Sequence, residues 1–90
     1  MEKTKFKIEY AEGVEEQLEN INRNIRDRIK KAIEERLTTN PNEYGKPLIR
    51  EWKGHRRLRV GDFRIIYKVY EEKIVVFIVD IDNRKDVYES

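Results

Sequence analysis

The sequence predicts an α+β fold with an N-terminal strand, a helical hairpin and then an antiparallel β-meander, with the helices packed on one face of the sheet. Apolar and charged side chains alternate at the start of the chain, which is typical of a half-buried strand. Apolar residues then recur at helical spacing from 14 to 37. After residue 47, β-branched and aromatic runs prevail, as in strands. Helices that follow this order bury their apolar side against one sheet face.

The length of 90 residues predicts a single domain, 1–90. Charged residues make up 42% of the chain, a share that also occurs in disordered proteins. The net charge is only +2, however, and the apolar residues are concentrated in runs such as 74–79. We therefore expect a folded domain.

The composition excludes several classes of function. The chain has no Cys and one His, so it offers no disulfide, thiolate metal site or multi-His centre, and we expect no cofactor. Ser90 is the only serine, which argues against serine hydrolysis. No apolar run approaches the roughly 18–20 residues of a membrane span, and the N-terminus has no apolar signal core. These features predict a soluble, cytoplasmic protein with no membrane contact.

The first half contains a strand and helices. Residues 5–10 form the strand, with the aromatic and aliphatic side chains on one face. The apolar spacing from 14 to 37 permits one long helix, but the capping residues at 20–24 favour a break. We expect helices at 12–21 and 24–38, followed by a loop at 39–47 that holds both prolines.

The second half contains a β-hairpin around Gly61-Asp62, because glycine at the first turn position suits a type II′ turn. This turn places Val60 opposite Phe63, and therefore Arg59 opposite Arg64. A strand at 63–70, a turn near 71–73 and a strand at 74–82 complete the meander. One face then carries the core residues Leu58, Val60, Phe63, Ile65, Tyr67 and Val69, and the other carries His55, Arg57, Arg59, Arg64 and Lys68.

The positive charge is concentrated on this hairpin. Residues 46–68 hold eight basic side chains against two acidic ones, a net charge of +6. Arg59 and Arg64 repel each other across the ladder, which costs stability unless a negative charge compensates. A bound anion such as phosphate would do so, because Arg grips phosphate with two donors. A solvated face of a highly charged protein is the alternative. Single residues also have a non-functional interpretation. His55, taken alone, is more typical of a surface histidine than of a catalytic one. Tyr44 and Trp52 are more typical of packing residues than of platforms for base stacking.

The hairpin, its surroundings and the C-terminus together resemble a known family. The stretch 58–67 resembles the signature hairpin of the RelE/ParE toxin superfamily. Pro41 with 45–48 is similar to the loop that follows the family's helices, and 76–78 with the Arg84-x-x-Val87-Tyr88 pattern is similar to its last strand and terminus. The resemblance runs in order through nearly the whole chain.

The resemblance implies the RelE fold and one of two activities, since RelE-type members are ribosome-dependent mRNA endonucleases and ParE-type members inhibit DNA gyrase. We expect the endonuclease, bound to ribosome and mRNA and neutralised by a cognate antitoxin. The alternatives are a ParE-like gyrase inhibitor and a non-catalytic member that binds RNA or antitoxin. The implied catalytic residues are Arg64, Arg84, Tyr88, Arg59 and His55, and the implied RNA-binding residues are Arg57, Arg56, Lys53, Lys68 and Lys46.

The expected chemistry needs no metal. The RNA 2′-OH attacks its adjacent phosphate and leaves a 2′,3′-cyclic phosphate, which requires a base, an acid and cations. Arg64 and Arg59 would neutralise the phosphate, and Tyr88 would act as base with its pKa lowered by nearby arginines. Arg84 would assist the leaving group. His55 stands where RelE itself has a lysine, and could serve as acid or base.

Overall fold

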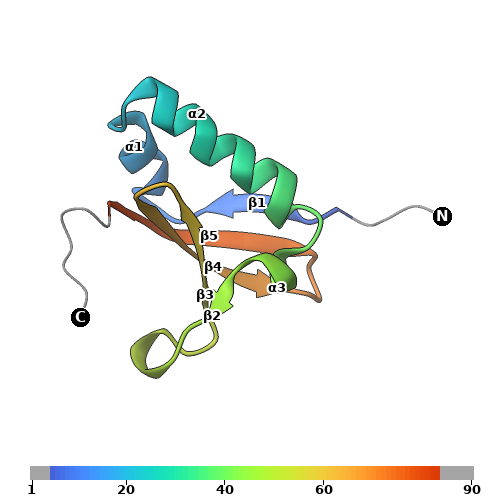
Figure 1. Ribbon diagram of the computed structural model, residues 1–90. Helices are drawn as coiled ribbons and strands as arrows, with labels where there is room; N and C mark the ends of the chain where they lie inside the picture. The colour runs from blue at the N-terminus through green and yellow to red at the C-terminus, as the bar shows by residue number, and fades with distance from the viewer. Residues whose placement is uncertain (1–4, 84–90) are drawn as a thin grey trace.

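The computed structural model describes residues 5–83, which form one five-stranded sheet with helices on one face (Figure 1). The strands are arranged in the order β1-β5-β4-β3-β2. This arrangement confirms the α+β expectation. In chain order the elements are β1 (Lys7–Tyr10), α1 (Val14–Glu19), α2 (Arg23–Ala32), the π-helix η1 (Ile33–Leu37), α3 (Pro41–Tyr44), β2 (Lys46–Pro47), the 3₁₀-helix η2 (Arg50–Trp52), β3 (Arg56–Val60), β4 (Phe63–Tyr70) and β5 (Val75–Asn83).

The predicted helical hairpin is confirmed, with its break at residues 20–22. The Asn22 side chain accepts a hydrogen bond of 2.9 Å from the Asn24 backbone N–H, which caps the start of α2. The apolar side of the hairpin packs on the sheet through the fully buried residues Ile29 and Leu37. The expected loop was wrong at 41–44, where a short helix begins with proline. Proline suits this first position because a backbone N–H there has no hydrogen-bond partner within the helix, so the lack of one in proline costs nothing.

The hairpin register is also confirmed. β3 and β4 are antiparallel, with Val60 opposite Phe63 and Arg59 opposite Arg64. Gly61 has a φ of 59°, in the left-handed region that the first position of the predicted turn requires. The predicted core face is buried or packs against the core. The turn that follows β4 leads directly into β5, as expected.

Pairing between distant parts of the chain forms one edge of the sheet. β1 lies parallel to β5, from Lys7 opposite Val75 to Tyr10 opposite Ile78. The first strand therefore pairs with the last one, beneath α2 (Figure 1). At the opposite edge, β2 is only two residues long and pairs with Arg56 and Arg57 of β3. The rest of β3 has no neighbour from β2 on that side.

No helix within residues 5–83 is long and apolar enough to cross a membrane.

Candidate nucleic-acid interface

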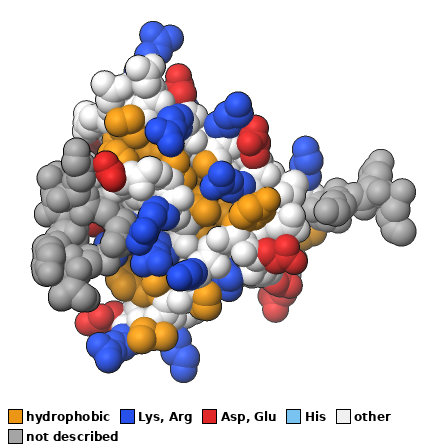
Figure 2. All heavy atoms as spheres, viewed as in Figure 1, with side chains coloured by type: hydrophobic (Ala, Val, Ile, Leu, Met, Phe, Trp, Pro, Cys, Tyr) orange, Lys and Arg blue, Asp and Glu red, His pale blue; other side chains and the backbone are white. Residues whose placement is uncertain are grey.

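A basic groove follows β3 at its open edge. Its wider part has a volume of about 550 Å³. A smaller hollow of about 270 Å³ continues it between β3 and α2, and both parts share Arg36 and Arg59. The charged residues of the whole groove are Arg28, Lys31, Glu35, Arg36, Lys46, Arg57 and Arg59, a net charge of +5. Figure 2 shows Lys and Arg side chains gathered through the middle of the face seen in Figure 1. We call this feature the basic groove.

The helical segment α2–η1 and strand β3 supply five of the six cations of the basic groove, and Lys46 of β2 is the sixth. Arg57 and Arg59 alternate along β3 and so point to the same side of the strand. Arg28, Lys31 and Arg36 share one side of α2 and η1. The sequence prediction overlooked these helical cations because it sought the site within the basic stretch 46–68. Their helical spacing was the signal that could have found them.

Tyr44 forms part of the wall of the basic groove. The Arg36 guanidinium carbon lies 5.8 Å from the centre of the Tyr44 ring, within the range of a cation–π contact. Tyr44 is 48% exposed and Trp52 is 42% exposed, so each ring packs on a neighbouring side chain, Arg36 and His55 respectively, and keeps part of its surface open. The exposed face of Tyr44 borders the groove beside Lys46.

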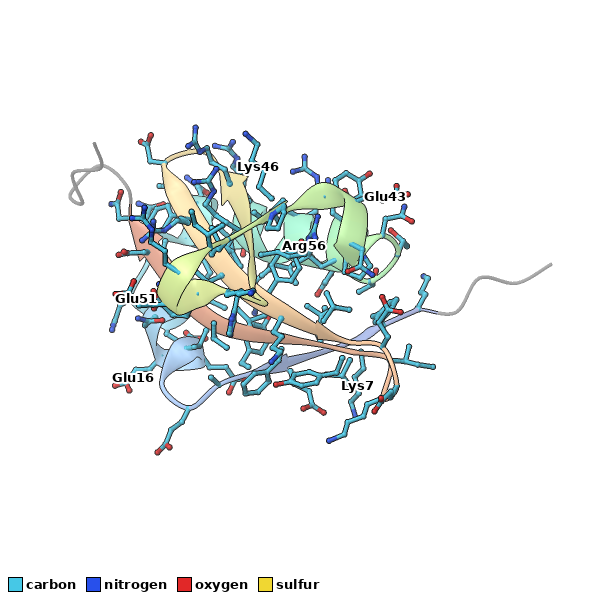
Figure 3. The ribbon with its side chains drawn as sticks, turned by 90° about the horizontal axis from the view of Figure 1, so that it is seen from below. Lys7, Glu16, Glu43, Lys46, Glu51 and Arg56 are labelled. Atoms are coloured by element: carbon cyan, nitrogen blue, oxygen red, sulfur yellow. The ribbon has the colours of Figure 1, made fainter. Side chains whose placement is uncertain are left out.

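Two hydrogen bonds, one buried and one partly buried, hold this wall against the sheet. The fully buried Tyr67 donates its hydroxyl hydrogen to the Pro41 carbonyl at 2.7 Å. Arg56 donates to the Gly45 carbonyl at 2.6 Å. A Cβ atom at Gly45 would overlap the Tyr67 hydroxyl, so only glycine fits there. Burial raises the pKa of Tyr67, and Arg56 opposes that rise through a hydrogen bond and its charge. Arg56 therefore fixes the wall from inside; Figure 3 shows it below Lys46.

Arg64 lies across the ladder from Arg59 and forms an ion pair with Asp82 of β5 at 3.3 Å. An irregularity in the β4–β5 register produces this pairing. Tyr70 to Tyr67 pair with Val75 to Ile78 in step, and beyond the shift Arg64 faces Asp82 instead of Ile81. Asp82 thus offsets part of the repulsion between Arg64 and Arg59 from within the protein.

The other predicted site residues are spread over the molecule. Lys68 lies on β4 with its ammonium 5.3 Å from the Tyr70 ring centre. His55 packs edge-on against Trp52 at 5.3 Å between ring centres, and Lys53 follows η2 in the same loop. Arg84 and Tyr88 lie outside the described residues. Of the ten predicted residues, the basic groove brings together Lys46, Arg57 and Arg59.

Residues 5–83 hold no cluster of three or more His, Asp or Glu side chains that could bind a metal ion. The basic groove is suited to binding a polyanion, because its guanidinium and ammonium groups can contact successive phosphates.

The family model described as the ParE toxin of the type II toxin–antitoxin system parDE matches residues 8–88. The chain therefore belongs to this family, within the RelE/ParE toxin superfamily. Among curated proteins, it is 38% identical over 52 residues to Toxin RelG of Mycobacterium tuberculosis. That match covers 58% of the chain and 60% of the relative, so the chain spans less than two thirds of the curated protein it matches.

Solved structures extend the similarity to almost the whole chain. The toxin–antitoxin complex RelBE2 of Mycobacterium tuberculosis matches with a TM-score of 0.85 and 25% identity, over 94% of this chain and 98% of that chain. The isolated RelE toxin of E. coli matches with a TM-score of 0.74 and 20% identity, over 94% and 87% of the two chains. The second match shows a common fold.

Proposed function

We propose that this toxin-family protein is a ribosome-dependent, metal-independent mRNA endonuclease of the RelE type. The observation that carries the proposal is the basic groove, in which α2, η1, β2 and β3 place six cations around one groove beside Arg64. A groove of this charge suits a single RNA strand, whose phosphates it would neutralise. The similarity to RelE toxins supports the same conclusion.

The strand path follows from the groove. Arg28, Lys31 and Arg36 contact the RNA backbone from the helix side, and Arg57 and Arg59 contact it from β3. The half-exposed Tyr44 offers a ring on which one base stacks, an interaction worth about 1–3 kcal/mol per base. This path delivers a phosphate to the open side of the Arg59–Arg64 pair.

The reaction joins the ribose 2′ oxygen to its neighbouring phosphorus and breaks the bond from phosphorus to the 5′ oxygen of the next nucleotide. Arg59 and Arg64 neutralise the extra negative charge of the transition state. Tyr88 takes the 2′-OH proton as phenolate. Arg84 stabilises the negative charge of the departing 5′ oxygen, which then takes a proton from water. His55 lies in the loop before β3 and is the second candidate for proton transfer.

The proposed partners are mRNA, the ribosome and an antitoxin, and the proposed location is the cytoplasm, where ribosomes translate. The solved relative from Mycobacterium tuberculosis is a toxin–antitoxin complex, which supports the antitoxin. Gyrase inhibition is the second candidate, because the matching family model is described as ParE.

The test is primer extension on mRNA translated by purified ribosomes. Wild-type protein should cut within codons, and Arg64→Ala/Tyr88→Ala should abolish the cuts while its circular dichroism stays unchanged. The matched control is Arg23→Ala/Tyr70→Ala, which removes the same two residue types at exposed positions outside the groove. Intact mRNA with wild-type protein, together with inhibited supercoiling by gyrase, would replace this proposal with the ParE activity.

A further inference from the structure

The edge of β3 contains one residue with an unpaired backbone beside the basic groove. β2 pairs with Arg56 and Arg57 only, and β3 continues past it to the turn (Figure 1). Arg59 therefore lies beyond the start of β2. It lines the wider part of the basic groove together with Tyr44 and Lys46. The open edge of β3 and the basic groove thus meet at Arg59.

The backbone N–H and C=O groups of Arg59 point outward from the sheet. In an antiparallel ladder, successive residues turn their backbone groups alternately toward the strands on the two sides. The His55 carbonyl accepts a hydrogen bond of 2.9 Å from the Leu48 N–H, on the β2 side. Arg57 and Arg59 follow His55 at intervals of two, so their backbone groups face the same side. Lys46 lies opposite Arg57, whereas no backbone group in the described part of the chain pairs with Arg59 there.

One donor next to one acceptor suits a nucleobase better than a peptide strand. β3 ends at Val60, so the open stretch is too short for the consecutive hydrogen bonds of an added strand. The Watson–Crick edge of each RNA base carries a donor beside an acceptor, and proteins recognise unpaired bases through this edge. The wider part of the basic groove, about 550 Å³, lies within the size range of ligand pockets. Arg57 and Lys46 on its wall supply charge for the flanking phosphates.

We propose that the β3 edge at Arg59 recognises an unpaired RNA base, which accepts a hydrogen bond from the Arg59 N–H and donates one to the Arg59 carbonyl. The proposal rests on the proposed function for RNA as the ligand. A base within a duplex already uses its Watson–Crick edge, so the site distinguishes single strands from duplexes. Tyr44 lines the same part of the groove, and its exposed ring is available to the flat side of this base. Ion pairing with phosphates supplies most of the affinity, and the strand edge adds selectivity.

The test compares two fluorescein-labelled RNA hexamers of uridylates that differ only in the position of one methyl group on each base. Methylation at N3 removes the donor of the Watson–Crick edge, whereas methylation at C5 leaves this edge intact and is the matched control. In fluorescence anisotropy with the full chain, the N3-methyl hexamer should bind about three- to tenfold more weakly, the usual effect of one lost hydrogen bond. The C5-methyl hexamer should shift the backbone amide resonance of Arg59.

Two substitutions of the same residue separate the backbone of Arg59 from its side chain. Arg59→Ala removes only the guanidinium, so it should weaken the binding of both hexamers and keep the ratio of their affinities. Arg59→Pro also removes the N–H and puts a ring carbon in its place, so it should bind both hexamers equally. Proline is tolerated on an edge strand where the N–H faces outward, and circular dichroism checks that the fold is kept.

Equal binding of the two hexamers to the wild-type chain, or an unshifted Arg59 amide, would overturn the proposal whether or not the proline variant folds. A hexaglutamate peptide that shifts the same amide and displaces the RNA at equal concentration would also overturn it, because the ligand would then be an acidic peptide. The assay contains neither ribosome nor mRNA. Failure of base recognition and failure of mRNA cleavage are therefore separate results.

Discussion

The basic groove and a second groove of opposite charge lie on two sides of one helical segment and show how a nearly neutral chain can hold two strongly charged surfaces. This acidic groove has a volume of about 760 Å³ and is lined by Ile8, Tyr10, Glu15, Glu16, Leu18, Glu19, Lys30 and Glu34. Arg28 and Arg36 line the basic groove, and Lys30 and Glu34, which lie between them in sequence, line the acidic one. The local net charges are +5 and −3, although the whole chain has a net charge of only +2. The composition gives only the average charge of the chain. The helical period places neighbouring residues on different sides of the helix, so charges that are mixed in sequence are separated in space.

The floors of the two grooves also differ. The basic groove is lined mainly by charged side chains on β3 and α2, so its binding energy comes from ion pairing and falls steeply with salt. The acidic groove adds an apolar floor and an open strand edge to its charges. Side-chain charge therefore dominates the first groove, whereas the second also offers apolar surface next to unpaired backbone groups.

The largest expected effect is on RNA affinity. Reversing two charges of the basic groove, Arg36→Glu/Arg59→Glu, should weaken binding to a single-stranded RNA oligonucleotide by at least about 100-fold at low salt, because each reversal puts a repelling carboxylate beside a phosphate. Fluorescence anisotropy over a KCl series should show the slope of log K against log salt falling by roughly 0.7 for each phosphate that the variant no longer neutralises.

The control for this experiment is Arg23→Glu/Lys73→Glu, which changes the net charge equally at exposed positions outside both grooves. An equal loss of affinity in this control would mean that total charge, and not the basic groove, determines RNA binding.

The next largest effect is on the stability of the fold at the wall of the basic groove. Gly45→Ala should destabilise the fold by about 2–3 kcal/mol, because the new methyl group overlaps the buried Tyr67 hydroxyl and crowds the Arg57 carbonyl at 2.9 Å. Gly45 has an extended backbone with a φ of −95°, so crowding alone causes the loss. Urea denaturation measures it.

Two further variants sharpen the result for Gly45. Gly54→Ala, at a φ of 94° with open space around it, should lose only about 1 kcal/mol from backbone strain. Adding Tyr67→Phe to Gly45→Ala should cost less than the sum of the two single changes, since the hydroxyl that clashes is gone. Strict additivity would contradict the proposed overlap.

A pH effect is expected in the acidic groove. The pKa of Tyr10 is raised in the folded state above its ordinary value of 10.0, by burial first and then by Glu34 and Glu15. The folded state thus holds this proton more tightly, so the resulting stability is present below pH 10 and is lost as the pH rises through the folded-state pKa. Tyr10→Phe should lose less stability than wild type between neutral pH and pH above 10 in urea titrations. An identical pH dependence in the two proteins would contradict the assigned shift.

The smallest effect is expected at the mouth of the acidic groove. Arg26 and Glu19 form an ion pair of 3.4 Å between α2 and α1, and the Glu19 side chain is 70% exposed. Glu19→Ala should change the free energy of unfolding by less than about 0.5 kcal/mol, because water screens exposed pairs. A loss above about 1 kcal/mol in urea denaturation would show that this pair holds the hairpin together.

Local patterns made much of the fold predictable. The break at 20–22 follows from capping residues, and the β3–β4 register follows from a two-residue turn with strict alternation. The partner of β1 was not predictable in this way, because residues 11–74 separate the paired strands. The helix at 41–44 was missed because its proline was interpreted as a loop signal.

The candidate site was predictable only in part. Alternation placed Arg57 and Arg59 correctly on one side of β3, but the contribution of α2 depends on how the helix packs over that strand. The Arg64–Asp82 pair depends on the register shift between Ile66 and Tyr67, which no local pattern marks. Arg84 and Tyr88 remain sequence predictions.

The pairing of β1 with β5 also has a consequence for the order of folding. Lys7 and Val75 are 68 positions apart, so their contact closes a long loop, whereas the helical hairpin and the β3–β4 hairpin close short ones. We expect the local hairpins to form early and β1 to join the sheet last. During synthesis β5 follows every other described element, so the edge that carries the acidic groove can be completed only after β5 has been made.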